Sequence, residues 1–360
     1  MVSKLKKLVA LVLVFITALT PIACKKDAYV TRSEKVFSSD ILMTVSAYGL
    51  KSSDLDEIYD FASELNSLIN PQIPTSQIAT FNAMQTGELK VDEHVFILVR
   101  EAKRVWNESN GAFDVSLSSL SKLWKVDNEN IFKSHEHDLP TQDQLDGMSS
   151  TMAGVELREQ SDGYYLVKTN PSTTLDLGGI AKGYLCDEIA KMLKNKNCNS
   201  ALVDVGGNLL LLGLHEADSK AEKWRVSVKS PTNAGILCGI KVENSSVVTS
   251  GTYERYYEKN NVKYCHIINP QTKMPIGVTK DDQGYKNEPS YVISCSVWGL
   301  SGTDCDALAT AVCVLGLERG KELLEAKNAT AIIVTSDGKY ALVGNVDFMD
   351  GYEVKGLERA

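Results

Sequence analysis

The segment from Asp176 to Tyr184, with the sequence DLGGIAKGY, constrains the fold more than any other part of the chain. Residues 174–177 have the pattern of a strand end, the glycine pair 178–179 interrupts it, and helical spacing begins at Ala181. The segment therefore predicts a strand, a tight turn and a helix start. Glycines let the backbone approach an anion, the free N–H groups of a first helical turn point toward it, and Lys182 adds a positive charge. We interpret this turn as a phosphate site.

A second segment, 302–315, has the pattern of a helix. Asp306 and Thr310 are four residues apart, which places a carboxylate and a hydroxyl on one helix face near its start. Mg²⁺ accepts such hard oxygen ligands when substrate phosphates supply others. Taken alone, the pattern favours an ordinary capped helix whose acidic residue suits the helix dipole. The metal interpretation therefore depends on the other motifs of the chain.

The N-terminal residues have the features of an export signal. Lysines at positions 4, 6 and 7 precede an apolar run, 8–19, that is too short to cross a hydrocarbon core of about 30 Å. Cys24 follows Ala23 at the place where a bacterial lipoprotein signal is cleaved and lipidated, although Pro21 replaces the usual leucine. The alternative is a buried N-terminal helix.

We therefore expect three parts: a lipoprotein signal peptide over 1–23, the lipidated Cys24 with a polar tether over 24–40, and one domain over 41–360. The protein is expected to be exported and anchored by its lipid to the cell (inner) membrane, facing the periplasm. No later apolar run is long enough to form a transmembrane helix.

The formal net charge of −8 argues against a nucleic-acid partner. Because the overall field repels anions, a phosphate site in this chain must depend on local glycines, Lys182 and a metal ion. The chain has eight cysteines but no CxxC pair, and the seven that follow Cys24 are an odd number. We therefore interpret most of these seven as small buried hydrophobic residues.

The order of predicted elements indicates an α+β fold with mixed, largely antiparallel sheets and flanking helices. The predicted helices are 53–69 with a cap at Ser53, 92–109 starting at Asp92, 181–194, and 302–315 with a cap at Thr303 or Asp304 and a stop at Gly316. The predicted strands include 164–169, 173–177, 224–229, 240–243, 247–250, 291–297 and 329–335. Residues 203–212 predict two strands joined at Gly206-Gly207.

Two further motifs favour the plainer interpretation. The segment Gly206-Gly207-Asn208 could be a second phosphate loop, but a hairpin turn is favoured because no helix start follows it. His135 and His137 form an HxH pair, yet no third ligand stands at metal spacing, and the surrounding charges indicate a solvated loop. We expect both histidines at the surface.

Ordered sequence blocks across nearly the whole mature chain resemble the FAD:protein FMN transferases, also called ApbE-type thiamine biosynthesis lipoproteins. The blocks are Met43-Thr44, 76–82, 110–114 leading to Leu123-Trp124, 176–184 with Asp187, 204–208, 250–253, 266–270 and 306–310. The resemblance implies a T-fold-related α+β domain with FAD in a groove. It also implies Mg²⁺-dependent transfer of FMN from FAD to a threonine hydroxyl, with release of AMP.

The resemblance carries over a set of site residues. Asp306 and Thr310 are implied as Mg²⁺ ligands together with the Gly179 carbonyl, and Asp306 is thereby also catalytic. The implied FAD contacts are Met43, Ala112, Phe113, Asp114, Asp176, Lys182 and His266. His266 is also our candidate base for the acceptor hydroxyl, because an ordinary histidine pKa of about 6.5 suits proton transfer near neutral pH; the alternative is a structural histidine. The implied acceptors are membrane redox complexes of the Rnf or Na⁺-translocating quinone reductase type.

Two positions depart from the family pattern. Lys273 stands where members usually have glycine, so the loop 269–275 is expected to differ in shape or charge near the site. Residues 70–73 lack the tyrosine that covers the flavin in many members, and an open site could admit water. One alternative is therefore a Mg²⁺-dependent FAD pyrophosphatase giving FMN and AMP. Another is a flavin-binding lipoprotein without catalysis, against which the Asp306–Thr310 pair speaks.

Overall fold

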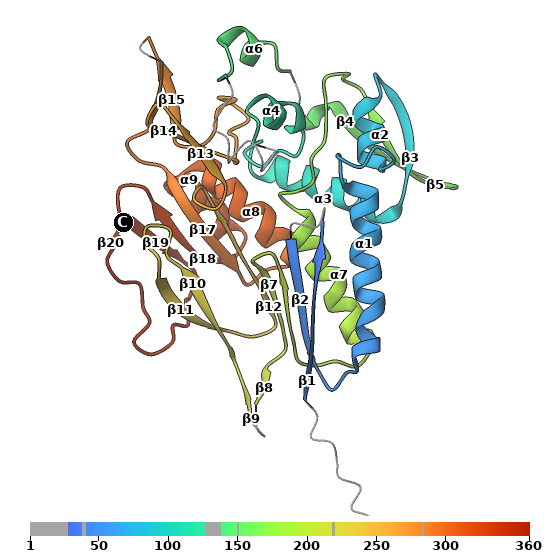
Figure 1. Ribbon diagram of the computed structural model, residues 1–360, viewed down its shortest axis with the longest axis vertical. Coiled ribbons are helices and arrows are strands. Elements are labelled where there is room, and N and C mark those ends of the chain that lie inside the picture. The colour runs from blue at the N-terminus through green and yellow to red at the C-terminus, as the bar shows by residue number, and fades with distance from the viewer. Residues whose placement is uncertain (1–27, 38–40, 127–137, 150, 218–219, 283) are drawn as a thin grey trace, which may run out of the picture.

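A nine-stranded sheet forms the centre of the protein in its computed structural model (Figure 1). The structure describes residues 28–37, 41–126, 138–149, 151–217, 220–282 and 284–360. The strands lie in the order β1 (Tyr29–Val36), β2 (Ile41–Tyr48), β6 (Ala201–Val205), β7 (Asn208–Leu212), β12 (Ser245–Gly251), β17 (Val292–Trp298), β18 (Thr330–Thr335), β19 (Lys339–Val343) and β20 (Glu358–Arg359). Neighbours are antiparallel apart from the short parallel pair β19–β20.

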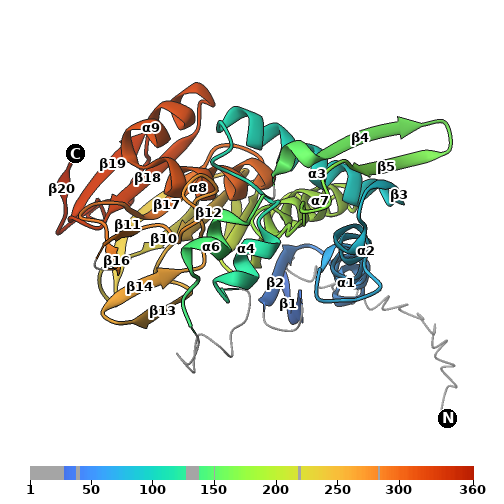
Figure 2. The same cartoon turned by 90° about the horizontal axis from the view of Figure 1, so that it is seen from above.

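Helices cover one face of this sheet, as Figures 1 and 2 show. The α-helices are α1 (Asp56–Ile69), α2 (Gln77–Ala83), α3 (Glu93–Glu108), α4 (Ser118–Leu123), α6 (Gln142–Asp146), α7 (Ala181–Asn195), α8 (Gly302–Leu315) and α9 (Leu317–Ala326). The described residues also form two short 3-10 turns, η1 (Ser52–Leu55) and η2 (Met152–Gly154). The main hydrophobic core lies between the helices and the sheet, where α7 packs on β7 and α8 packs on β12 and β17.

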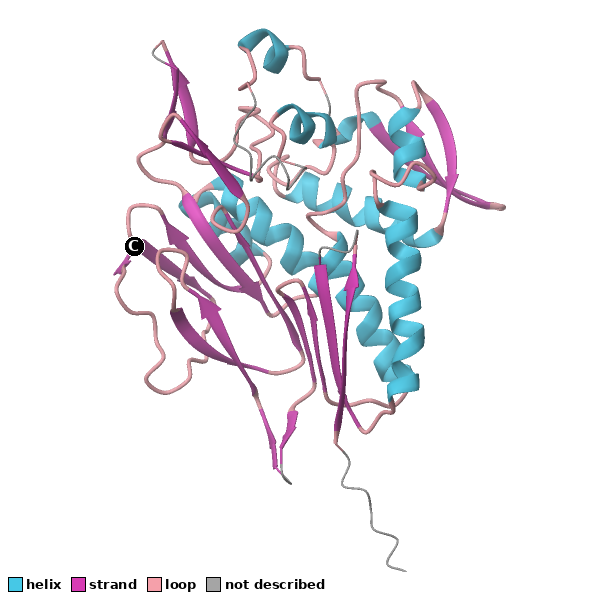
Figure 3. Ribbon diagram, viewed as in Figure 1, coloured by secondary structure: helices cyan, strands magenta, loops and turns pink. Residues whose placement is uncertain are grey.

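Smaller sheets surround this core (Figure 3). They are β3 (Gly87–Val91), β5 (Gly163–Lys168) and β4 (Val155–Gln160); β8 (His215–Ala217) with β9 (Lys220–Glu222); β10 (Trp224–Lys229) with β11 (Ile236–Val242); β13 (Tyr256–Lys259) with β14 (Val262–Cys265); and β15 (Val278–Asp281) with β16 (Gly284–Asn287). A second hydrophobic cluster joins β10 and β11 to the main sheet, and a third surrounds the stacked rings of Tyr257 and Tyr264. The α+β class predicted from the sequence is confirmed.

The turn between β6 and β7 confirms the predicted hairpin. Val205 pairs with Asn208, so only Gly206 and Gly207 form the turn. Their φ angles of 57° and 92° are left-handed, a conformation that favours glycine and matches the twist of a tight hairpin.

Four local predictions are wrong. Residues 29–36, which were expected to belong to a polar tether over 24–40, form strand β1 and pair with β2 in the main sheet. Residues 173–177 do not form a strand, because this segment makes only an isolated bridge between Thr174 and Leu117. Helix α8 is capped by Ser301, whose hydroxyl accepts a hydrogen bond from the Asp304 N–H at 3.1 Å, and not by Thr303 or Asp304. Ser53 lies inside the 3-10 turn η1 and caps nothing.

The cysteines and the helices also test expectations about disulfides and membrane spans. All seven cysteines in the described residues are buried and unpaired, which confirms their interpretation as hydrophobic residues. No helix in the described part of the chain is long and apolar enough to cross a membrane. Cys24, His135 and His137 lie outside the described residues.

Candidate active site

A groove with a volume of about 1400 Å³ collects most of the predicted site residues. Its lining includes Ala112, Phe113, Asp114, Asp176, Gly179, Lys182, His266, Asp306 and Thr310. These residues come from four separate parts of the sequence. The groove exceeds the 300–1000 Å³ of ordinary small-molecule pockets, so a large ligand can enter it together with part of a partner.

The glycine turn at the start of α7 forms one side of the groove. The Asp176 carboxylate accepts a hydrogen bond from the Gly178 N–H at 2.9 Å, which closes the turn. The ammonium of Lys182 donates to the Gly178 carbonyl at 3.2 Å and so lies over the same turn. No side chain caps α7, whose preceding residue is Ile180. This side of the groove therefore combines a helix start and a cation, as a bound phosphate requires.

The start of α8 forms the facing side. Asp306 is only 3% exposed, and its carboxylate accepts a hydrogen bond from the Gly183 N–H at 2.9 Å. Its other oxygen lies 3.5 Å from the Lys182 ammonium. The Thr310 hydroxyl lies one helical turn further on and is 3.0 Å from the Ser250 hydroxyl. The two predicted motifs thus meet, although Gly183 and Asp306 are 123 residues apart in the sequence.

The donors that these two sides offer are oxygens, the ligand type that Mg²⁺ prefers. Among the described residues, no three His, Cys, Asp or Glu side chains are grouped to hold a metal ion. Asp306, Thr310 and the Gly179 carbonyl would therefore offer one charged and two neutral oxygen donors. Mg²⁺ prefers such sparse oxygen coordination and takes its remaining ligands from water and phosphate.

Helices α7 and α8 cross so closely that backbone touches backbone. A Cβ atom added to Gly183 would lie 2.1 Å from the Gly302 carbonyl oxygen, and one added to Gly302 would lie 2.5 Å from the Gly183 oxygen. Any larger residue at either position would push the helices apart. The two glycines thus fix the distance between Lys182 and Asp306.

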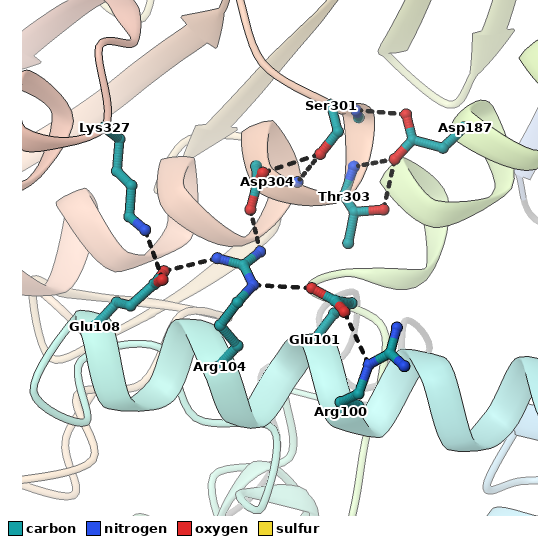
Figure 4. A network of polar contacts seen from close by, with 10 residues as sticks. Arg100, Glu101, Arg104, Glu108, Asp187, Ser301, Thr303, Asp304 and Lys327 are labelled. Carbon is teal, nitrogen blue, oxygen red and sulfur yellow. Dashed lines mark hydrogen bonds and ion pairs between the residues drawn. The ribbon is translucent and has the colours of Figure 1, made fainter.

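Asp187 holds the same crossing one turn further along α7 (Figure 4). Its carboxylate accepts hydrogen bonds from the N–H groups of Gly302 at 2.7 Å and Thr303 at 2.9 Å, and from the Thr303 hydroxyl at 2.6 Å. Burial raises the pKa of Asp187, and the hydrogen bonds from Thr303 and Gly302 oppose this rise. Asp187 is therefore a positioning residue for the helix that carries Asp306.

An ion-pair network on the outer side of α8 adds a second attachment (Figure 4). Arg104 of α3 pairs with Asp304 of α8, with Glu101 at 2.8 Å and with Glu108 at 2.7 Å. Glu108 also pairs with Lys327, beyond the end of α9, at 2.6 Å. The network joins α3 to both α8 and the end of α9.

The segment 112–117 forms a third wall beside the glycine turn. The Asp176 N–H donates to the Val115 carbonyl at 2.8 Å, which fixes the two segments side by side. Asp114 is engaged within this wall: it accepts hydrogen bonds from Trp106 Nε1 at 3.1 Å and from the Ser116 N–H at 2.7 Å. Burial raises the pKa of Asp114 above its ordinary value, and the hydrogen bonds from Ser116 oppose this rise. The phenyl ring of Phe113 lies against Gly179.

His266 lies on the opposite wall with a fixed ring. Its Nδ1 is 3.2 Å from the Arg255 carbonyl oxygen, so Nδ1 carries the proton and donates it to this bond. Burial, and secondarily the charge of Arg255, lowers the pKa of His266 to about 3. The ring is therefore neutral at physiological pH, and its Nε2 carries a lone pair. The ordinary pKa of about 6.5 that the sequence suggested for His266 is wrong, because the site buries the ring next to Arg255.

The structure places two other predicted positions differently. Met43 is fully buried in the main core and its side chain does not line the groove, so the implied flavin contact is not seen. Lys273 adopts a left-handed φ of 60°, but its ammonium donates to the Leu145 carbonyl at 2.9 Å, at the end of α6. Its charge is thus directed to a helix end and not into the groove. Asn70 and Gln72 line the groove where many family members have tyrosine.

The sequence interpretation gave no site role to Arg255 or Ser250, and it favoured a hairpin turn over a phosphate loop for Gly206-Gly207-Asn208. Arg255, Ser250 and Asn208 all line the groove, and Ser250 and Asn208 lie within the blocks that carry the family resemblance. No spacing rule singles out Arg255 or Ser250, because each lies in or beside a strand or turn whose neighbours come from distant segments. Only the assembled sheet brings them to α7 and α8.

A smaller hollow of about 460 Å³ lies between β11, β12, β17 and residues 345–348. Its two lysines are engaged with acids: Lys223 pairs with Asp347 at 3.0 Å and Lys241 pairs with Asp350 at 3.5 Å. The motifs identified in the sequence do not reach this hollow.

The fold and the groove define a mixed α+β protein whose site joins a glycine turn at a helix start to a buried carboxylate and a hydroxyl. Such a site suits a phosphorylated ligand with a hard cation. A model of the ApbE family matches residues 39–334, and the chain belongs to this family. The resemblance inferred from the sequence is confirmed.

Relatives and solved structures agree with this assignment. The FAD:protein FMN transferase of Treponema pallidum is 30% identical over 311 residues, which cover 81% of this chain and 80% of the relative. The protein of the same name from Escherichia coli K12 is 26% identical over 278 residues, covering 76% and 74%. The solved flavin transferase ApbE from Vibrio cholerae superposes with a TM-score of 0.73 at 23% identity, covering 90% of this chain and 100% of that one. This last likeness supports the fold.

Proposed function

We propose that this protein transfers the FMN moiety of FAD to a threonine hydroxyl of an acceptor protein and releases AMP, in a Mg²⁺-dependent reaction. The observation that carries the proposal is the meeting of the α7 glycine turn with Asp306 and Thr310 in one groove. The names of the relatives, FAD:protein FMN transferases, support the substrate and the reaction class.

The reaction has a simple balance of bonds. The threonine oxygen attacks the phosphorus of the FMN half, a new phosphoester bond forms, and the bond from that phosphorus to the bridging oxygen breaks. AMP leaves with the bridging oxygen. Phosphoryl transfer of this kind depends mainly on positioning and charge neutralisation. Bound Mg²⁺ would neutralise part of the diphosphate charge.

The residues of the chain supply the rest. Lys182 and the first turn of α7 bind phosphate oxygens, and Asp306 and Thr310 would hold the metal with the Gly179 carbonyl. His266 Nε2 accepts the proton of the threonine hydroxyl, because Nδ1 is held by the Arg255 carbonyl. The ring is neutral at neutral pH, so its lone pair is free to accept the proton, but the lowered pKa makes His266 a weaker base than an ordinary histidine.

Hydrolysis of FAD to FMN and AMP is the second candidate function. The groove rim at Asn70, Pro71 and Gln72 has no aromatic ring to cover a flavin. Water could therefore reach the same phosphorus and replace the threonine hydroxyl. Both reactions need the same residues at the diphosphate.

The partition between transfer and hydrolysis can be measured directly. We expect purified residues 25–360 with FAD and Mg²⁺ to attach FMN to an acceptor protein that contains an Asp-Gly-Xaa-Ser/Thr-Gly-Ala-Thr segment. The assay is covalent flavin fluorescence of the acceptor in a denaturing gel, with AMP quantified in parallel. An acceptor with alanine at the last threonine is the matched control. AMP with free FMN and no labelled acceptor would instead establish the pyrophosphatase, and no AMP at all would contradict both.

The acceptors and the location follow from the same proposal. We infer acceptor subunits of the Rnf or Na⁺-translocating quinone reductase type, and an exported enzyme attached by a lipid on Cys24 to the inner membrane. The sequence features of residues 1–24 support export. Palmitate labelling of the full chain and of Cys24→Ala in bacterial cells tests the anchor.

Loss of the Asp187 carboxylate should weaken the response to Mg²⁺. We expect Asp187→Ala to lower the free energy of unfolding by about 1–3 kcal/mol, because three buried donors of α8 lose their acceptor. A shifted α8 should also raise the Mg²⁺ concentration for half-maximal AMP release by about tenfold or more.

The control for Asp187 is Glu188→Ala, which removes only a surface pair with Lys191 at 2.6 Å and should cost at most about 1 kcal/mol. Thermal unfolding and a Mg²⁺ titration of the rate are the two measurements. A fall in stability without a change in the Mg²⁺ midpoint would make Asp187 purely structural.

A further inference from the structure

Two buried side-chain atoms in the described part of the chain have no hydrogen-bond partner: Asn208 Nδ2 and the Tyr264 hydroxyl oxygen. Tyr264 lies in the aromatic cluster with Trp124 and Tyr257, outside the groove. Asn208 is only 3% exposed, and it is also part of the groove wall. Native proteins pair nearly all buried N–H groups, because an unpaired one loses its bonds to water without replacement. The Asn208 amide therefore needs an acceptor that the protein itself does not supply.

The position of Asn208 identifies where that acceptor lies. Asn208 is the first residue of β7, and strand alternation puts it on the same face as Leu210 and Leu212, which belong to the core beneath the helices. Its carbonyl oxygen is 3.7 Å from the Cys186 sulfur. Cys186 follows Lys182 by one turn of α7, so the two residues lie on the same side of that helix. Asn208 therefore lies next to the second turn of α7, one turn beyond Lys182.

The neighbouring strand brings the other half of the site to the same place. Leu209 pairs with Val247 of β12, so β12 continues past Asn208 toward Ser250. Ser250 is the residue whose hydroxyl lies 3.0 Å from that of Thr310. Asn208 is thus located between α7 and the strand that supports Thr310.

We propose that Asn208 is a binding residue for the diphosphate group, with its amide Nδ2 donating a hydrogen bond to a phosphate oxygen of the bound dinucleotide. A neutral amide donor suits this position because it adds affinity for an anion without competing with Mg²⁺ for the same oxygens. The inference rests on the proposed function, because it takes FAD as the ligand. It assigns to the β6–β7 hairpin a role in recognition of the phosphates, in addition to its role in the sheet.

The test separates the phosphate contact from folding. Asn208→Leu removes the donor and nearly keeps the volume. We expect it to weaken FAD binding about 10- to 100-fold, the effect of losing a hydrogen bond to a charged group, and to leave riboflavin binding unchanged. We also expect the ligand-free variant to melt at a higher temperature than the wild type, because a buried unpaired N–H is gone. Quenching of flavin fluorescence and thermal unfolding are the measurements.

Two further variants complete the design. Asn208→Asp keeps the shape but places a carboxylate toward the phosphates, so FAD affinity should fall at least as far as in Asn208→Leu. Asn170→Leu is the matched control: its amide is already paired with the Ser149 carbonyl at 3.2 Å, and it does not line the groove. This control should keep wild-type FAD affinity. If Asn208→Leu does not fold, Asn208→Ala carries the same test.

The outcomes distinguish this inference from the proposed function. Wild-type FAD affinity in Asn208→Leu or Asn208→Asp overturns the inference alone, and so does an equal loss of FAD and riboflavin binding. Failure of the wild type to bind FAD overturns the proposed function, and the inference with it.

Discussion

Replacement of Asp306 by alanine should reduce Mg²⁺-dependent AMP release from FAD about 1000-fold, the scale on which loss of one preorganised charged group affects phosphoryl transfer. The carboxylate is buried, lies 3.5 Å from the Lys182 ammonium and accepts the Gly183 N–H. Without it the metal loses its only charged protein ligand among those we infer. Release of AMP measured by chromatography, across a range of Mg²⁺ concentrations, gives the result.

Two further variants show whether the effect is chemical. Asp306→Asn keeps an oxygen that can accept the Gly183 N–H, so it should fold normally and still lose most of the activity. Asp304→Ala lies on the same helix and removes the pair with Arg104 and the hydrogen bond from the Ser301 hydroxyl, but its side chain does not line the groove. It should retain most of the activity. Unchanged AMP release by Asp306→Ala would overturn the metal assignment.

Replacement of His266 by alanine should lower transfer to the acceptor about 100- to 1000-fold, the usual contribution of a positioned general base. Binding of FAD should fall less than the transfer rate, because His266 is one of several implied FAD contacts but the only base that we propose for the acceptor hydroxyl. Added imidazole should restore part of the rate by entering the space that the side chain leaves. His215→Ala, which removes a histidine outside the groove, is the control. Equal losses of FAD binding and transfer, with no rescue, would make His266 structural.

The lowered pKa of His266 predicts how the transfer rate responds to pH. Because the pKa is about 3, the base stays deprotonated and the rate should not fall through His266 between pH 8 and pH 5. An ordinary histidine, with a pKa of about 6.5, would lose most of its basic form across that interval. Between about pH 3 and pH 6.5, His266 is protonated in the unfolded chain but not in the folded one, so the unfolded chain binds more protons. The contribution of His266 to stability is therefore lost as the pH falls from about 6.5 toward 3.

Long helices and buried strands could be predicted from local patterns. The bounds of α8, 302–315, and of β10, 224–229, agree with the structure because apolar periodicity and glycine stops act within a few residues. The cap of α8 could not be predicted in the same way. Ser301, Thr303 and Asp304 are all residue types that can cap a helix. Which of them caps α8 depends on distant helices, because the Thr303 hydroxyl donates to Asp187 and the Asp304 carboxylate pairs with Arg104.

The site residues likewise include some that local sequence patterns could predict and some that they could not. Spacing alone placed Asp306 and Thr310 on one helix face, and the structure confirms that their side chains line the same groove. Their meeting with Lys182 was implied by the family resemblance, because local patterns do not say which helices cross. Met43 shows the opposite case: the family resemblance implied a flavin contact, whereas its place in β2 directs the side chain into the core, which was the alternative interpretation. Asn208 was interpreted correctly as part of a hairpin, yet its place on the groove depends on the neighbouring strand β12.

The backbone contact between Gly183 and Gly302 has a consequence for how the protein can change over time. The distance between two binding side chains can usually change during evolution, because a residue can be replaced by a longer or shorter one. Here the separation of the two helices is already at its minimum, so substitution can only increase it. Natural variation and laboratory evolution can therefore remodel the rim at residues 70–72, while the separation of α7 and α8 cannot decrease. On the function proposed above, the choice between threonine and water as nucleophile would then change without a change in the spacing of Lys182 and Asp306.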